Sequence, residues 1–164
     1  MNVADLLAKT GLVGRVLFVG QAEQASSLAE KLGLREVYVA DTNHEALERK
    51  AKSDGGVKVL PVYTRVIERF VDLPSSSLDA VVSFYALEKA LNKRAFMTEA
   101  RRVLRAGGKL VIACKLKTFL RKKGLGKKDL KKLLEVDGFT VESKNLSWDE
   151  AFIVLVKSGS QQGG

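Results

Sequence analysis

The chain has 164 residues, of which 46% are hydrophobic and 29% charged, and its net charge is +9; this size and mixture are typical of one globular domain. No apolar run approaches the roughly 20 residues that span a bilayer, residues 1–10 lack the apolar core of a secretion signal, and Cys114 has no partner for an internal disulfide. We therefore expect a single cytoplasmic domain over residues 1–158, not embedded in a membrane, and a disordered polar tail over residues 159–164.

The first part of the chain predicts two strands, each followed by a helix. Residues 15–20 and 36–41 are short β-branched runs, and apolar residues at helical spacing follow both of them. Gly33 is expected to end the first helix, and Thr42 or Asn43 is expected to cap the second. The inward positions of the two helices are Leu28, Ala29, Leu32, Ala46 and Leu47.

The middle of the chain predicts two more strands. Residues 57–63 form the first of them, and because Pro61 cannot donate to a sheet ladder, we expect this strand at an edge of the sheet. The apolar spacing over residues 66–71 predicts a short helix. Residues 78–85 are almost wholly apolar, as a strand covered on both faces should be.

A long helix and a fifth strand are expected next. Apolar residues recur at helical spacing over residues 87–104, and Gly107 and Gly108 are expected to end that helix. Its predicted inward positions are Leu87, Ala90, Leu91, Phe96, Ala100, Val103 and Leu104. Residues 109–114 then predict a strand, at whose end Cys114 is expected to be packed in the core.

The positive charge is concentrated in residues 115–132, which hold nine basic residues and one acid, Asp129. The segment thus carries eight of the nine net positive charges, and an anionic partner should meet it first. Its second half shows Leu130, Leu133 and Leu134 as an apolar stripe on a lysine-rich helix. Either the segment is a solvated surface of the kind common in proteins from hot environments, or it contacts nucleic acid.

Two strands are predicted near the end of the chain, at residues 139–143 and 151–156, and their short connection favours an antiparallel pair. Before them, strands and helices alternate through five strands, a pattern that requires a parallel sheet with helices on both faces. The predicted fold class is therefore α/β, with a mostly parallel sheet that ends in an antiparallel pair.

This order of elements resembles the class I S-adenosylmethionine-dependent methyltransferases, whose seven-stranded sheet has the order 3-2-1-4-5-7-6 with strand seven antiparallel. The resemblance covers about residues 12–157 and is most specific in residues 77–115, where the family's fourth strand and its entry to strand five are matched by SLDAVVSFYALEKAL and RRVLRAGGKLVIACK. Ala106 stands where the family usually has proline. The resemblance implies a Rossmann-like fold and a site for S-adenosylmethionine.

The resemblance also indicates candidate cofactor residues. The family's glycine-rich turn after strand one is represented by Gly20, Gln21 and Ala22, of which only the first is glycine. Asp41 ends the second strand and is similar to the carboxylate that accepts hydrogen bonds from the ribose hydroxyls, although it could instead cap the next helix or bond the loop after its strand. The acid that family members often place near the adenine has no counterpart in residues 62–65.

A few other residues complete the candidate set. By the same resemblance, Thr42, Ser83 and residues 84–85 are expected to line the cofactor pocket. Tyr85 could stack a target base or pack in the core, and Trp148 could stack a nucleotide, although we expect it to seal the final turn against the sheet. His44 is expected to be a surface residue. The sequence identifies no catalytic residue and no metal site.

These observations leave several functions open. Our first hypothesis is a methyltransferase-fold protein with an atypical or degraded S-adenosylmethionine site, working mainly by binding RNA or a ribonucleoprotein. The alternative is an active methyltransferase on a nucleic-acid or other acidic substrate, because methyl transfer depends mostly on proximity and alignment. A homo-oligomer, or a subunit that partners an active methyltransferase, is a third hypothesis. The residues expected to contact nucleic acid are Lys115, Lys117, Arg121, Lys122, Lys123, Lys127, Lys128 and Lys131.

Overall fold

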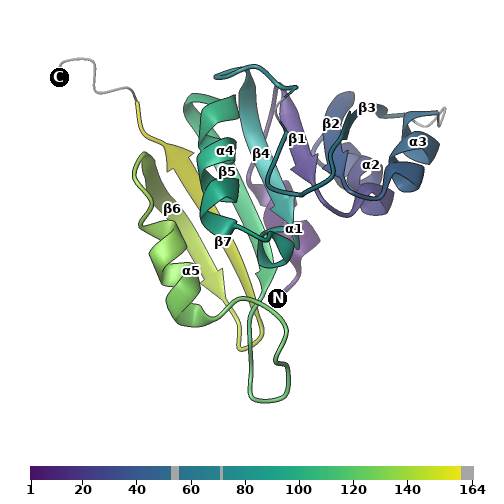
Figure 1. Ribbon diagram of the computed structural model, residues 1–164. Helices are drawn as coiled ribbons and strands as arrows, with labels where there is room; N and C mark the ends of the chain where they lie inside the picture. The colour runs from purple at the N-terminus through teal and green to yellow at the C-terminus, as the bar shows by residue number, and fades with distance from the viewer. Residues whose placement is uncertain (53–55, 71, 160–164) are drawn as a thin grey trace.

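The computed structural model describes residues 1–52, 56–70 and 72–159 (Figure 1). Within these residues, seven strands form one sheet in the order β3-β2-β1-β4-β5-β7-β6. The neighbours among β1 to β5 pair in parallel, whereas β7 is antiparallel to both β5 and β6. The predicted fold class and strand order are confirmed. The strands are β1 Val16–Val19, β2 Glu36–Asp41, β3 Lys58–Tyr63, β4 Leu78–Phe84, β5 Leu104–Lys115, β6 Phe139–Leu146 and β7 Glu150–Lys157.

Helices cover both faces of the sheet, as Figure 1 shows. The helices α1, α2 and α3 share one hydrophobic core with one face of the strands, while η1, α4 and α5 share the other core. The sequence did not predict α1, which begins where the side chain of Asn2 accepts a hydrogen bond from the backbone of Asp5. The bounds are α1 Val3–Lys9, α2 Ala22–Lys31, α3 His44–Ala51, the 3₁₀ helix η1 Leu87–Lys89, α4 Lys93–Val103 and α5 Lys127–Leu134.

Three local predictions are confirmed by the structure. The strand that contains Pro61 lies at an edge of the sheet, where it pairs with β2. Asn43 caps α3, its side chain accepting a hydrogen bond from the backbone N–H of Ala46 at 3.1 Å. Gly33 follows the end of α2 with φ of +76°, a left-handed conformation that glycine adopts without strain.

The helix predicted over residues 66–71 is wrong as far as the structure describes it, because residues 66–68 form a bend and a turn and residues 69–70 have no regular secondary structure. The spacing of apolar residues there has another cause, since Ile67 and Phe70 are both buried in the core. The backbone N–H of Phe70 donates to the Glu99 carboxylate at 3.0 Å. The Glu99 side chain on α4 thus takes the place of the backbone carbonyl that would accept from this N–H in a helix. Residue 71 lies outside the described residues.

The long helix predicted over residues 87–104 is interrupted, and only its ends, η1 and α4, are helical. Asn92 starts α4 afresh, because its side chain accepts a hydrogen bond from the Ala95 N–H at 2.9 Å. The backbone N–H of Asn92 in turn donates to Glu68 at 2.7 Å. Leu91, predicted to point inward, lies at the break and is 87% exposed.

The predicted end of this helix is also corrected. The helix ends at Val103, and β5 begins directly at Leu104 and continues through Gly107 and Gly108. Leu104 is drawn into the sheet because it pairs with Leu78 of β4. The two glycines therefore lie within a strand and do not stop the helix.

The end of the chain follows the prediction more closely. Leu130, Leu133 and Leu134 are buried on the inner side of α5, and β6 and β7 form the expected antiparallel pair. Of the tail predicted to be disordered, residues 160–164 lie outside the described residues. No helix in the described ranges is both long and apolar enough to cross a membrane.

Candidate functional site

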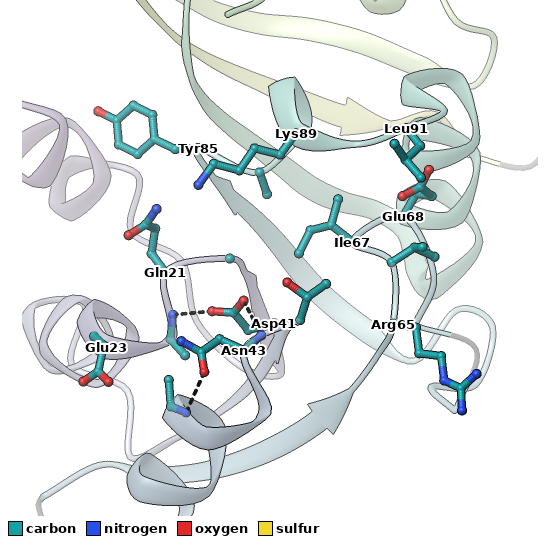
Figure 2. Close-up of a pocket in the computed structure, with 16 residues that line it drawn as sticks. Gln21, Glu23, Asp41, Asn43, Arg65, Ile67, Glu68, Tyr85, Lys89 and Leu91 are labelled. Carbon is teal, nitrogen blue, oxygen red and sulfur yellow. Dashed lines mark hydrogen bonds between the residues drawn. The ribbon is translucent and has the colours of Figure 1, made fainter. Parts of the chain in front are cut away.

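A cavity of about 420 Å³ lies at the carboxyl ends of β1, β2 and β4, where open parallel sheets collect their ligands (Figure 2). We call it the Asp41 cavity. The structure brings together there five of the residues predicted for the cofactor, Gly20, Gln21, Ala22, Asp41 and Thr42. Its volume lies within the range of about 300–1,000 Å³ that small-molecule and cofactor sites occupy.

The turn after β1 brings bare backbone to this cavity. Gly20 has φ of +84°, and an added Cβ would lie 3.1 Å from both the Ala86 Cβ and the Phe84 carbonyl oxygen. Its N–H donates to the Ala40 carbonyl at 2.8 Å, which fixes the turn against β2. Gln21, the residue that precedes α2, also has a positive φ of 55°. Gln21 therefore adopts the left-handed backbone conformation that a glycine would adopt more easily.

Asp41 ties this turn to the loop after β2. One carboxylate oxygen accepts a hydrogen bond from the Ala22 N–H at 3.0 Å, and the other accepts from the Asn43 N–H at 3.1 Å (Figure 2). The loop-bonding alternative for Asp41 is thus realised. Because a carboxylate oxygen has more than one acceptor site, these bonds leave room for a ligand hydroxyl as well.

Glu68 is a residue of this site that the sequence reasoning missed. It lines the Asp41 cavity yet is only 8% exposed. One carboxylate oxygen accepts from the Asn92 N–H at 2.7 Å, while the other is buried without a hydrogen-bond partner among the described residues. Such an orphan acceptor is costly and needs a donor from a ligand or water. Glu68 lies three residues beyond residues 62–65, the segment after the third strand in which the sequence shows no acid.

The structure places Ser83 away from the other predicted cofactor residues. Its side chain is fully buried, and its hydroxyl oxygen accepts a hydrogen bond from the Leu87 N–H at 3.2 Å. Ser83 thus holds the start of η1 and does not line the cavity. Of the predicted lining residues 83–85, Tyr85 does line this cavity, together with Ala86.

A second cavity of about 860 Å³ adjoins the first, and we call it the basic cavity. Gln21, Tyr85 and Lys89 line both cavities. Its outer wall is the basic loop, residues 116–126, together with Lys115 at the end of β5. The residues predicted to contact nucleic acid fall into two groups, those that line this cavity and those that do not. Those that line the cavity are Lys115, Lys117, Arg121, Lys122 and Lys123, whereas Lys127, Lys128 and Lys131 lie on α5 and are not part of the lining.

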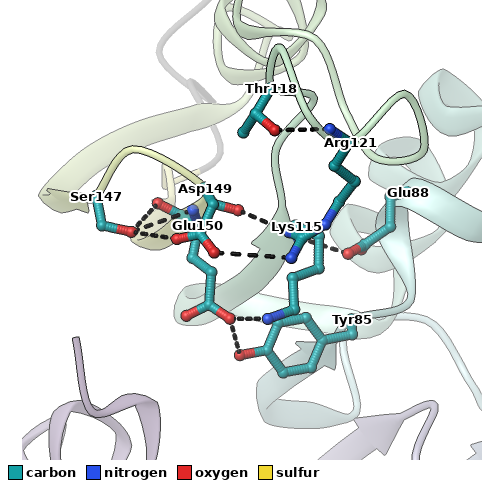
Figure 3. A network of polar contacts seen from close by, with 8 residues as sticks. All are labelled: Tyr85, Glu88, Lys115, Thr118, Arg121, Ser147, Asp149 and Glu150. Carbon is teal, nitrogen blue, oxygen red and sulfur yellow. Dashed lines mark hydrogen bonds and ion pairs between the residues drawn. The ribbon is translucent and has the colours of Figure 1, made fainter.

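A polar network supports the wall between the cavities (Figure 3). The Tyr85 hydroxyl donates to a Glu150 carboxylate oxygen at 3.2 Å, and the same oxygen pairs with the Lys115 ammonium. That ammonium lies 5.1 Å from the centre of the Tyr85 ring. Burial raises the pKa of the Tyr85 hydroxyl above its usual value, so it remains a hydrogen-bond donor. Tyr85 also has a positive φ of 56°, a strain that for an aromatic residue is often found at functional sites.

Glu88 completes the network from η1. One of its carboxylate oxygens accepts from the Lys115 N–H at 2.6 Å, and the other is buried without a partner within the described ranges. Burial is the main cause that raises the pKa of Glu88 above its ordinary value. Glu88 also lines the basic cavity, to which it brings a weakly acidic carboxyl group.

Acids neutralise only part of the basic wall. Lys115 pairs with Glu150, and Arg121 lies 3.7 Å from the Asp149 carboxylate. In the part of the chain that the structure describes, no ion pair involves Lys117, and the same holds for Lys122 and Lys123. The cavity therefore keeps a positive wall that can attract an anion.

The other residues singled out in the sequence, His44, Cys114 and Trp148, lie outside both cavities. His44 lies exposed at the start of α3, with a ring nitrogen 2.9 Å from the Thr64 carbonyl oxygen. Cys114 is buried as predicted, and burial raises the pKa of its thiol to about 12. Trp148 does not seal the final turn, because it is 66% exposed. Over residues 1–52, 56–70 and 72–159, no three His, Cys, Asp or Glu side chains are grouped so as to hold a metal ion.

Comparisons with known proteins agree with this fold. A family model described as "Methyltransferase domain" matches residues 18–112. A structure of a SAM-dependent methyltransferase from Aquifex aeolicus is similar with a TM-score of 0.73 and 19% identity, covering 94% of this chain and 89% of that one. A chain of a Haloferax volcanii complex that contains the Trm112 methyltransferase activator is similar with a TM-score of 0.74 and 13% identity, covering 94% and 88%.

The cyclase SpnF is similar too, with a TM-score of 0.77 and 16% identity, covering 96% of this chain and 80% of that one. No curated protein sequence matches the chain. Structural likeness at such identities shows a shared fold, and a fold that carries both methyltransferases and a cyclase does not by itself fix a reaction.

Proposed function

The chain belongs to the methyltransferase domain family, and from this premise we propose that it binds S-adenosylmethionine in the Asp41 cavity and transfers the methyl group to an acceptor in the basic cavity. The observation that carries the proposal is that the two cavities adjoin and share Gln21, Tyr85 and Lys89. Methyl transfer requires a donor and an acceptor side by side and in line, which this arrangement provides.

The residues of the Asp41 cavity fit such a cofactor. Because Gly20 has no side chain, the turn packs closely against Ala86 and the Phe84 carbonyl and can keep the shape that the ligand needs. Asp41 would accept hydrogen bonds from the ribose hydroxyls, and Glu68, once its side chain turns toward the cavity that it lines, would accept one from the adenine amino group. When bound, the cofactor supplies an electrophilic methyl group. The loss of the family's second and third glycines does not close the cavity, which counts against a degraded site.

The residues between the cavities would position the acceptor. Tyr85 forms part of both walls, and its ring is held by Glu150 and Lys115. Lys117 and its neighbours on the basic loop would attract an acidic acceptor. Glu88 lines the same cavity, and burial raises its pKa above the ordinary value, which makes it a candidate acid or base for the acceptor.

Calorimetry with S-adenosylmethionine tests this function. We expect measurable binding, weakened about ten-fold or more by Asp41→Ala, because charged hydrogen bonds contribute about 1.5–3 kcal/mol each. Asp41→Asn, which keeps one acceptor oxygen, should lose less. Asp137→Ala, an exposed aspartate outside both cavities, is the matched control. A folded wild-type protein that shows no binding would overturn the proposal in favour of a degraded site.

A second function, contact with RNA or a ribonucleoprotein, is favoured by the charge of the basic loop. Lys117, Lys122 and Lys123 are exposed and line one cavity, so that their charges converge on a single bound polyanion. The lysines of α5 lie outside that lining. We therefore assign the nucleic-acid contact mainly to the loop and less to the helix.

A pair of charge reversals separates the loop from the helix. Lys122→Glu with Lys123→Glu should weaken RNA binding strongly and reduce the slope of log affinity against log salt by about one unit per lysine. Lys127→Glu with Lys128→Glu makes the same change of charge on α5 and should have a smaller effect. Binding can be measured by fluorescence anisotropy of a labelled RNA at several salt concentrations. A flat salt response would contradict the phosphate contact.

A further inference from the structure

Two exposed aromatic side chains lie on neighbouring loops at the carboxyl-end side of β5. Phe119, on the basic loop, is 99% exposed, and Trp148, in the turn between β6 and β7, is 66% exposed. Figure 1 shows the basic loop and this turn next to each other beneath the sheet. The two residues are far apart in sequence, so only the fold brings them to the same side of the molecule.

The two loops are joined by several interactions (Figure 3). The Leu116 N–H donates to the Asp149 carbonyl at 2.9 Å, and the Arg121 guanidinium lies 3.7 Å from the Asp149 carboxylate. Within the basic loop, the Arg121 N–H donates to the Thr118 hydroxyl at 2.9 Å. At its base, the Lys117 N–H donates to the Leu125 carbonyl at 2.9 Å. The loop is thus shaped by hydrogen bonds, and its aromatic residue is left free for a partner.

The surroundings of these aromatic residues combine apolar area with positive charge. Leu120, 84% exposed, extends the apolar surface beside Phe119. Lys117, Lys122 and Lys123 line the adjoining basic cavity. Clustered exposed apolar residues mark interaction sites, and aromatic side chains beside a positive groove are the usual means of binding single-stranded nucleic acid.

We propose that Phe119 and Trp148 form a stacking platform for the bases of a single-stranded nucleic acid, one nucleotide of which enters the basic cavity. This inference rests on the proposed function and names its substrate class. Stacking on side chains needs the open faces of unpaired bases. The cavity, of about 860 Å³, is large enough for a nucleotide on the scale of small-molecule sites.

The placement of the charges favours this partner over a membrane or a duplex. The unpaired lysines line a concave wall, which a thin, flexible strand can follow. A flat lipid surface meets cations on a convex rim, and a base in a duplex reaches a pocket only after it is unstacked.

The chain offers a direct probe, because Trp148 is its single tryptophan. We expect a single-stranded RNA oligonucleotide to quench the Trp148 fluorescence and to bind at least about ten-fold more tightly than a duplex of the same sequence, given a cost of a few kcal/mol to unstack a paired base. A nucleoside monophosphate and anionic phospholipid vesicles should quench it far less at equal phosphate concentration. Equal quenching by the duplex, the monophosphate or the vesicles would overturn the inference.

Variants test whether stacking, and not charge alone, is responsible. Phe119→Ala should lower the affinity for single-stranded RNA about ten-fold, as for one base that loses its aromatic partner, without changing the salt slope. Trp148→Phe should keep most of the affinity and Trp148→Ala should lose it, measured with a labelled oligonucleotide. Val13→Ala, an exposed apolar residue on the segment before β1, is the control. Affinity unchanged by Phe119→Ala and Trp148→Ala would overturn the platform.

The failure of this inference can be told apart from the failure of the proposed function. Calorimetry of the wild-type protein with S-adenosylmethionine tests the Asp41 cavity without any nucleic acid. Cofactor binding without a preference for single strands would contradict the stacking platform but not the methyl-transfer proposal. RNA binding by Phe119 and Trp148 in a protein that binds no cofactor would sink the methyl-transfer proposal alone.

Discussion

Replacing Phe96 by alanine is expected to lower the free energy of unfolding by about 3–5 kcal/mol, the usual cost of removing a buried phenyl ring. Phe96 lies in α4 and is fully buried between that helix and the sheet. Its ring meets Phe70 edge to face, with 6.2 Å between the ring centres. Glu68, two residues before Phe70, lines the Asp41 cavity. Loss of the Phe96 ring should therefore also loosen the wall of this cavity that Glu68 forms.

Urea denaturation followed by circular dichroism measures this effect. Phe119→Ala is the matched control, because it makes the same chemical change on a ring that is almost wholly exposed. We expect it to change the free energy of unfolding by less than about 0.5 kcal/mol. Similar losses for the two variants would contradict the assignment of Phe96 to the core.

Replacing Gly20 by valine is expected to destabilise the turn after β1 and to weaken cofactor binding. A side chain in the left-handed conformation costs about 1–2 kcal/mol, and overpacking adds about 1–3 kcal/mol. The added Cβ would already lie 3.1 Å from Ala86 and from the Phe84 carbonyl oxygen. Because the turn must keep its shape to present the backbone of the Asp41 cavity, binding of S-adenosylmethionine should fall at least about ten-fold.

Gly33→Val is the control for the backbone strain alone. Gly33 also has a positive φ, of +76°, but an added Cβ there meets nothing within 4 Å. We expect this variant to lose stability without losing cofactor affinity. Denaturation and calorimetry on both proteins separate the two effects. If the two variants bound the cofactor equally well, the close approach of backbone at Gly20 would have no role in binding.

The proposed site differs from the family pattern mainly in its glycine turn. Gln21 stands in the left-handed conformation, with φ of 55°, so the chain tolerates strain where a glycine would have none. Asp41 offsets part of that strain by bonding the next N–H, that of Ala22, at 3.0 Å. The turn therefore keeps an open cavity with a single glycine.

Much of the fold could be predicted from the sequence because the elements follow local patterns. The apolar runs that became β1 and β4 are continuous in sequence, and nearly all of their residues are buried in the sheet. The parallel pairing followed from the alternation of strands with helices, and the order of the strands from the resemblance to the methyltransferases.

Two helix predictions failed because side chains from other segments replace the local backbone hydrogen bonds of a helix. Asn92, whose own N–H is bonded by Glu68, breaks the predicted long helix. Glu99 takes the N–H of Phe70 and leaves a turn where a helix was expected. Apolar spacing reports which residues are buried but not which partner satisfies each backbone group, and both breaks depend on such partners.

For the site, the sequence by itself determined the residue types: a glycine after the first strand, an acid after the second and a basic segment after the fifth. Only the tertiary structure decided that Ser83 is buried, that Glu68 faces the Asp41 cavity, and that the basic loop and Trp148 lie at the same side of the sheet. The physical reason is that crossovers of the parallel sheet bring the carboxyl ends of its strands together, whatever their separation along the chain.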